Sequence, residues 1–178
     1  DSTGVRSVNK GAFSTSFEAD LVDALRKKGR DTISLVAEQS SEIVGHIMFS
    51  PANIEQNPQN KHIYGLAPMA VRPNLQRQGI GSALVKAGLQ ACAEHNIDIV
   101  VVLGHPEYYP RFGFEQASIY NISCSYEVPD EAFMVIALND GALNTISGTV
   151  TYHPLLTSPS TDPCLNILRV ICAIFKSF

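Results

Sequence analysis

The most chemically suggestive stretch of the sequence is a short loop at residues 76–81, Gln-Arg-Gln-Gly-Ile-Gly. Gly79 and Gly81 allow backbone conformations and close approaches that a β-carbon would prevent. A helical pattern follows, so the first N–H groups of that helix and the positive end of its dipole lie beside the glycines. Backbone of this kind binds phosphate or pyrophosphate groups. Three basic residues add positive charge to this part of the chain, namely Arg72, Arg77 and Lys86.

Two well-known kinds of phosphate-binding loop do not fit this stretch. A P-loop requires a Gly-Lys pair, and none is present here. A dinucleotide-binding loop requires a third glycine where Leu84 stands, and an acidic residue about 20 positions later that is not evident. On the glycine pair alone, a strand-to-helix loop that binds nothing is the favoured interpretation. Whether the loop binds phosphate therefore has to be judged from the elements that flank it.

Segments with clear periodicity flank the loop. Residues 63–71 are predicted to form a strand whose hydrogen-bond ladder is interrupted, because Pro68 has no N–H to donate. Residues 82–95 are predicted to form a helix with one apolar face. Residues 97–103, with the sequence IDIVVVL, are typical of a strand that is buried on both faces. The aromatic residues 106–112 are expected to form one helical turn.

The rest of the chain supplies further elements of one α/β domain. A helix is expected over residues 17–28, and a hairpin over residues 33–37 and 43–49. Residues 51–60 are polar and are predicted to be a loop. Further strands are expected in three places: residues 119–126, 132–138 and 149–152.

The two ends of the chain fit this pattern less well. Residues 1–16 are polar, so an opening strand is either missing or replaced by residues 5–8, which would expose a sheet edge. We assign residues 1–155 to the domain and residues 156–178 to a linker and an apolar tail helix. Packing on the domain or formation of a homodimer is favoured for this tail over a membrane-surface role, because the tail carries few charges.

Length and composition narrow the classes of function. The 178 residues fit one domain, and 45% apolar with 17% charged residues excludes a disordered chain. The net charge of −4 argues against a general nucleic-acid binder. Neither a signal pattern nor a membrane-spanning apolar run is evident, so we expect a cytoplasmic protein without a membrane partner. Four cysteines lack zinc-site spacing and are predicted to be free thiols: Cys92, Cys124, Cys164 and Cys172.

These segments resemble the GNAT superfamily of N-acetyltransferases. Three motifs occur in the right order, and the resemblance extends over about residues 18–138. The motifs are an apolar-Ala-Val-x-Pro run at Met69 to Pro73, an acyl-CoA motif at Gln76, Gly79 and Gly81, and Tyr-x-x-x-Gly-Phe at Tyr109 to Phe114. The HPEYYPRFGF form and the later Tyr-Glu-Val-Pro are similar to one bacterial subgroup of predicted, largely unassigned acetyltransferases.

The resemblance implies an α/β (α+β) fold: a mixed, mostly antiparallel sheet of about six or seven strands, flanked by helices and splayed between its two central strands. It implies acetyl-CoA as co-substrate, no metal, and a small-molecule or peptide amine as acceptor. The residues that would hold the coenzyme are Met69, Ala70, Val71, Gln76, Arg77, Gln78, Gly79, Ile80, Gly81 and Ser82. Tyr109 would protonate the departing thiolate, since a phenol and a thiol have comparable pKa values. Tyr108 is its rival for this role.

The general base is less evident than the acid. Many members of the superfamily carry an acidic residue on the central strand, but residues 64–71 contain no Asp or Glu. Candidates elsewhere are His46, His62, His105 and Glu107. His105 and Glu107 rank first because they lie nearest Tyr109 in the sequence, and a water chain is a further option. Two functions remain open: an acetyltransferase, and a CoA-binding sensor or partner-binding module without catalysis.

Overall fold

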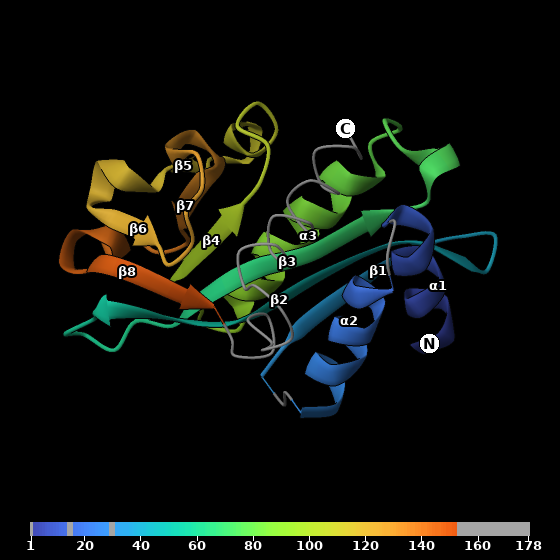
Figure 1. Cartoon of the computed structure of the whole chain (residues 1–178), viewed down its shortest axis with the longest axis horizontal. Helices are drawn as coiled ribbons and strands as arrows, with labels where there is room; N and C mark the ends of the chain where they lie inside the picture. The colour runs from blue at the N-terminus through green and yellow to red at the C-terminus, as the bar shows by residue number, and fades with distance from the viewer. Residues whose placement is uncertain (1, 14–15, 29–30, 153–178) are drawn as a thin grey trace.

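The computed structural model describes residues 2–13, 16–28 and 31–152 (Figure 1). The predicted tail, with Cys164 and Cys172, lies outside these residues. Within these residues the α-helices are α1 (Ser2–Ala12), α2 (Phe17–Lys28) and α3 (Ile80–Glu94). The strands are β1 (Ile33–Gln39), β2 (Glu42–Gln56), β3 (Ile63–Val71), β4 (Ile99–Leu103), β5 (Glu115–Gln116), β6 (Ile122–Cys124), β7 (Phe133–Ala137) and β8 (Ser147–Tyr152). Short 3-10 turns are η1 (Pro73–Leu75), η2 (Tyr109–Phe112), η3 (Ala117–Tyr120), η4 (Asp130–Ala132) and η5 (Ala142–Thr145).

The strands form one mixed sheet in the order β5-β7-β4-β3-β2-β8-β6, with β1 also paired to β2. Pairing is antiparallel except for β3 with β4 and β6 with β8, so the predicted fold class is confirmed. The long strand β2 pairs with β3 along one edge. Its other edge is shared, because β1 pairs with it as far as Phe49 and β8 from Ala52 onward.

The prediction of a loop over residues 51–60 was wrong for its first half, because β2 continues to Gln56. Pro51 is tolerated because it lies between the β1 pairing and the β8 pairing, where this edge needs no ladder hydrogen bond. The predicted interruption at Pro68 is confirmed by a shift in register between Ile47 and Phe49 on the neighbouring strand.

The two central parallel strands, β3 and β4, pair over only part of their length and then diverge. Pairing of β3 with β4 runs from Ile63 opposite Ile99 to Leu66 opposite Val102. Beyond that point β3 continues to Val71, whereas β4 ends at Leu103. The last five residues of β3 therefore have no partner on the β4 side within the described residues, and their backbone groups border an opening.

Helices cover both faces of the sheet (Figure 1). A separate hydrophobic core lies on each face. One core contains Val5 of α1 and Leu25 of α2, and the other contains Leu84 and Val85 of α3. Close approach of α3 to β2 depends on Gly88, because a β-carbon there would lie 2.3 Å from the Phe49 ring. Helix α3 begins at Ile80, two residues earlier than predicted.

The N-terminal segment is a helix, so the proposed replacement of an opening strand by residues 5–8 was wrong. Val5, Val8 and Asn9 recur at helical spacing and are all buried. Arg6 fastens α1 to α2 through ion pairs with Asp20, at 2.6 Å, and Asp23. Within the described residues, β1 pairs only with β2, so the expected open sheet edge is present.

Two other strand predictions were too long. Only Ile122–Cys124 of residues 119–126 is a strand, because η3 occupies Ala117–Tyr120 and Asn121 adopts a left-handed φ of 56°. The strand predicted over residues 97–103 begins at Ile99. The strands expected over residues 132–138 and 149–152 are present as β7 and β8.

Candidate active site

A cleft of about 560 Å³ lies where β3 and β4 part and α3 begins. One wall is formed by the end of β3 and the start of α3, and the other by the segment that follows β4. The lining residues are Met69, Val71, Gln76, Arg77, Gly79, Gly81, Ser82, His105, Glu107, Tyr108 and Arg111. The structure therefore brings the glycine loop and the tyrosine motif, which are separate in the sequence, to one place.

The loop before α3 has the backbone geometry of an anion site. Arg77 and Gly79 both adopt left-handed conformations, with φ of 61° and 89°. The loop is fixed at its start, because the Gln76 side-chain amide donates to the Val71 carbonyl at 3.1 Å. Alternation of left-handed residues in a turn directs backbone N–H groups into a concave surface. The sequence thus needs glycine at position 79, whereas Arg77 adopts this conformation at an energetic cost.

The first turn of α3 offers unused hydrogen-bond donors. Ala83 is the first residue to bond back, donating to the Gly79 carbonyl at 2.9 Å, so the N–H groups of Ile80, Gly81 and Ser82 have no acceptor within the helix. No side chain caps this end, and no acidic residue lies in the first turn. These donors and the helix dipole fit a pyrophosphate group.

Tyr108 closes the cleft against the start of α3. A β-carbon at position 81 would lie 2.9 Å from the Tyr108 hydroxyl oxygen, so the missing side chain of Gly81 allows this approach. Burial raises the pKa of Tyr108 above its ordinary value, and the Ser82 hydroxyl and the Arg111 charge oppose that rise. The ring is held edge-on against Tyr109 and Phe112, with centroids 5.1 and 5.2 Å away.

Tyr109 lies behind Tyr108 and is fully buried. Its ring packs on Gly104, where a β-carbon would be 2.2 Å away, and edge-on against Phe114. Its hydroxyl has no hydrogen-bond partner among the described residues. Burial raises its pKa far above the ordinary value, so the hydroxyl remains protonated. Tyr109 is not among the residues that line the cleft, in contrast to Tyr108.

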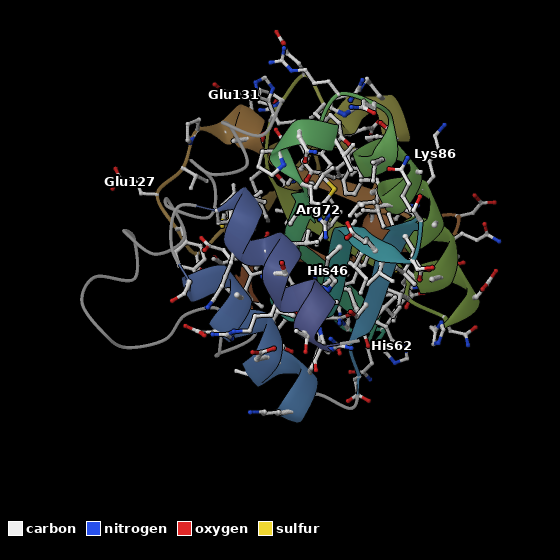
Figure 2. The ribbon with its side chains drawn as sticks, turned by 90° about the vertical axis from the view of Figure 1, so that its right-hand side faces the viewer. His46, His62, Arg72, Lys86, Glu127 and Glu131 are labelled. Carbon is white, nitrogen blue, oxygen red and sulfur yellow. The ribbon has the colours of Figure 1, made fainter. Side chains whose placement is uncertain are left out.

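The four candidate bases fall into two groups. His105 and Glu107 line the cleft, and the His105 Nδ1 atom accepts the Glu107 N–H at 3.2 Å, so neutral His105 carries its proton on Nε2. His46 lies between α1 and the sheet, fully buried, with Asn9 Nδ2 3.1 Å from Nδ1 and Ser34 Oγ 3.0 Å from Nε2 (Figure 2). Burial lowers the His46 pKa to about 4. His62 is exposed on another part of the surface, and neither His46 nor His62 lines the cleft.

Most of the predicted coenzyme-binding side chains line the cleft, but three do not: Ala70, Gln78 and Ile80. Ala70 packs instead with Val8 and Phe13 on the opposite face, because successive strand side chains alternate. Of the basic residues near the loop, Arg72 is half-buried and pairs with Glu42, at 2.6 Å, whereas Lys86 is exposed on α3 (Figure 2). Arg111 was missed; its only signal in the sequence is its place inside the tyrosine motif.

Other classes of site are not evident in the described part of the chain. Its His, Cys, Asp and Glu residues form no group of three that could hold a metal. Cys92 and Cys124 are free thiols, as predicted, and burial raises the pKa of Cys92 to about 12. Among these residues, no helix is long and apolar enough to cross a membrane.

Comparison with known proteins finds a matching family and related sequences. The model of the acetyltransferase (GNAT) family matches residues 4–114. The N-acetyltransferase YhbS of Escherichia coli K12 is 36% identical over 154 residues, 86% of this chain and 91% of YhbS. The N-acetyltransferase YjhQ of the same strain is 37% identical over 134 residues, 74% of each chain.

Solved structures with the same fold carry the coenzyme. The crystal structure of E. coli YhbS in complex with CoA has a TM-score of 0.81 at 34% identity, covering 90% of this chain and 88% of that one. A GNAT family acetyltransferase from Brucella melitensis in complex with acetyl-CoA has a TM-score of 0.71 at 33% identity, covering 87% and 91%.

Proposed function

The chain belongs to the acetyltransferase (GNAT) family, and on that premise we propose that it transfers an acetyl group from acetyl-CoA to a primary amine by direct attack. The observation that carries the proposal is the cleft between the parted strands, with donor-rich backbone on one wall and titratable side chains on the other. The coenzyme supplies the acetyl group as an activated thioester. The acceptor is a small-molecule or peptide amine.

The backbone wall would bind and orient the coenzyme. The N–H groups of Ile80, Gly81 and Ser82 would hold the pyrophosphate. The open edge of β3 at Met69 and Val71 would hold the pantetheine arm and polarise the thioester carbonyl. On the side that faces β4 the backbone there has no strand partner among the described residues, although the Val71 carbonyl already accepts from the Gln76 side chain. Holding the thioester in line with the amine removes most of the entropic cost of the encounter.

Tyr109 is the proposed proton donor to the departing thiolate. Its hydroxyl is buried and without a partner among the described residues, so its donor is unused, and transfer to the thiolate requires the bound thioester to reach it behind Tyr108. Tyr108 is a second candidate because its ring lines the cleft and its hydroxyl lies beside the start of α3. Substitution of each tyrosine separately distinguishes the two.

Glu107 is the proposed general base. Its side chain is exposed at the cleft and would take the proton that the ammonium group must lose before attack. His105 is less suited, because its Nδ1 lone pair already accepts the Glu107 N–H and its Nε2 carries the proton in the neutral form.

Thermal unfolding with and without acetyl-CoA, followed by an amine screen, tests this function. Acetyl-CoA at a hundred times Kd should stabilise the fold by about 2.7 kcal/mol and raise Tm by about 5–10 °C. NAD at the same concentration should not. Release of CoA with any amine in the panel supports the transferase. A Tm shift without turnover on any amine would favour a CoA-binding sensor, and no Tm shift in folded protein would overturn both.

A further inference from the structure

We propose that Arg111 is a second phosphate-binding element, which holds a phosphate of the nucleotide half of the coenzyme from the wall opposite the glycine loop. This inference rests on the proposed use of acetyl-CoA. It assigns a binding role to a residue that lies outside the glycine motif and on another element.

The Arg111 side chain is held in place at the cleft. Its Nε donates to the Tyr108 carbonyl at 3.1 Å. Its guanidinium carbon lies 4.4 Å from the centre of the Tyr108 ring and 5.6 Å from that of Phe112. Cation–π contacts of this length are attractive, and with the hydrogen bond they restrict the rotamers of the side chain. The ordering cost of a long flexible side chain is therefore largely met before a ligand arrives.

The charge of Arg111 is not neutralised within the described residues. No carboxylate there lies within ion-pair distance of its guanidinium, although Glu107 lines the same cleft. Arg6 and Arg72, in contrast, both form ion pairs with carboxylates. With Nε used internally, the two terminal amino groups of Arg111 are left to bind a ligand. A planar pair of such donors matches the oxygens of a phosphate group.

The surroundings favour a phosphate of the coenzyme over an unrelated anion. The Tyr108 ring contacts the guanidinium of Arg111, and its hydroxyl approaches the start of α3 at Gly81. The guanidinium therefore lies one ring away from the proposed pyrophosphate site. Coenzyme A carries a 3′-phosphate in addition to its pyrophosphate, and either group could be the partner. The phosphate chemistry is the same in both cases, and shortened ligands separate them.

The test measures binding alone, by titration calorimetry of CoA, dephospho-CoA and pantetheine at fixed ionic strength. The variants are Arg111→Gln and Arg111→Lys, with Arg72→Gln as a matched control because Arg72 lies outside the cleft lining and is paired with Glu42. We expect R111Q to weaken CoA binding by about tenfold or more, since a hydrogen-bonded charge is lost. R111K, which keeps the charge but not the planar fork, should lie between R111Q and wild type.

The shortened ligands identify the phosphate. Loss of the R111Q effect with dephospho-CoA assigns the 3′-phosphate, and its persistence there but not with pantetheine assigns the pyrophosphate. Affinity for CoA within twofold of wild type, or an equal loss for pantetheine, would overturn the role. If R111Q does not fold, R111K and the salt dependence of wild-type CoA binding carry the test. Failure of wild-type protein to bind CoA would instead overturn the proposed function.

Discussion

The two walls of the cleft present different chemical groups. The wall formed by β3, the glycine loop and the start of α3 presents backbone groups, and its key residues at positions 79 and 81 have no side chain. The wall that follows β4 presents side chains: His105, Glu107, Tyr108 and Arg111. Substitutions that add a β-carbon are expected to impair the function of the backbone wall. Substitutions that remove side-chain atoms are expected to impair the function of the side-chain wall. The backbone wall is suited to binding, and the side-chain wall adds groups for proton transfer to the binding role proposed for Arg111.

The largest expected effect concerns two adjacent tyrosines, Tyr108 on the side-chain wall and Tyr109 directly behind it. Tyr109→Phe should lower kcat by about 10²-fold or more, because a general acid is lost. Its stability should not fall, since the hydroxyl removed has no partner among the described residues. Tyr108→Phe is the matched control and should lower kcat by less than about tenfold. Steady-state kinetics and thermal unfolding of both variants check this.

The reverse pattern would exchange the roles of the two tyrosines. A large loss in Y108F with near-normal kcat in Y109F would assign the acid to the ring that lines the cleft. The pH profile adds an independent readout. Because burial keeps the pKa of Tyr109 well above its ordinary value, we expect no loss of kcat from its ionisation as pH rises to about 10.

A second effect on the same wall concerns the base. Glu107→Gln should lower kcat by about 10²-fold with little change in the Kd for CoA, because the carboxylate acts on the amine. His105→Gln, in the same wall, should lower it less. Pre-steady-state acetyl transfer at saturating acetyl-CoA measures the step directly. Equal activity of E107Q and wild type would leave a water chain or His105 as the route for the proton.

The backbone wall was the more predictable of the two from the sequence. Glycine spacing and the start of a helix are local features, and together with the flanking motifs they predict a phosphate site at residues 76–82. The orientation of Tyr108 and Tyr109 was not predictable, because it depends on Gly81 and Gly104, whose missing side chains leave room for these rings. Arg111 was missed for a related reason: a single arginine shows no periodicity, and its lack of a carboxylate partner among the described residues is a tertiary property.

The fold shows the same division between local and non-local causes. The helix over residues 17–28 follows from its own periodicity, and the strand over residues 99–103 follows from its unbroken β-branched run. Strand β2 extends through Pro51 because β8 pairs with the same edge of β2 just after the pairing with β1 ends. A local sequence pattern does not contain this information. Helix α1 was missed because its apolar residues are few, and its burial depends on packing against β2 and β3.

His46, the buried polar group under α1, should affect the stability of the fold and not coenzyme binding in the cleft. Burial lowers the His46 pKa from 6.5 to about 4, so the unfolded state takes up a proton first as pH falls. The stability contributed by neutral His46 is therefore present above pH 6.5 and is lost between pH 6.5 and 4, by about 3 kcal/mol. Chemical denaturation over this range should show a flatter decline in His46→Gln. Kd for CoA at pH 7.5 should not change in this variant, because His46 does not line the cleft.

The smallest effect tests the backbone wall by adding atoms rather than removing them. Gly79 has a φ of 89° and open space around its Cα, so Gly79→Ala introduces conformational strain of about 1–2 kcal/mol without a steric clash. We expect CoA affinity to fall by about tenfold and kcat at saturation to change little. Gly79→Asn is the matched control, since Asn tolerates the left-handed conformation and should retain more affinity. If both variants bind CoA as tightly as wild type, the conformation at position 79 does not shape the anion site, and the binding role of this wall rests on the first turn of α3.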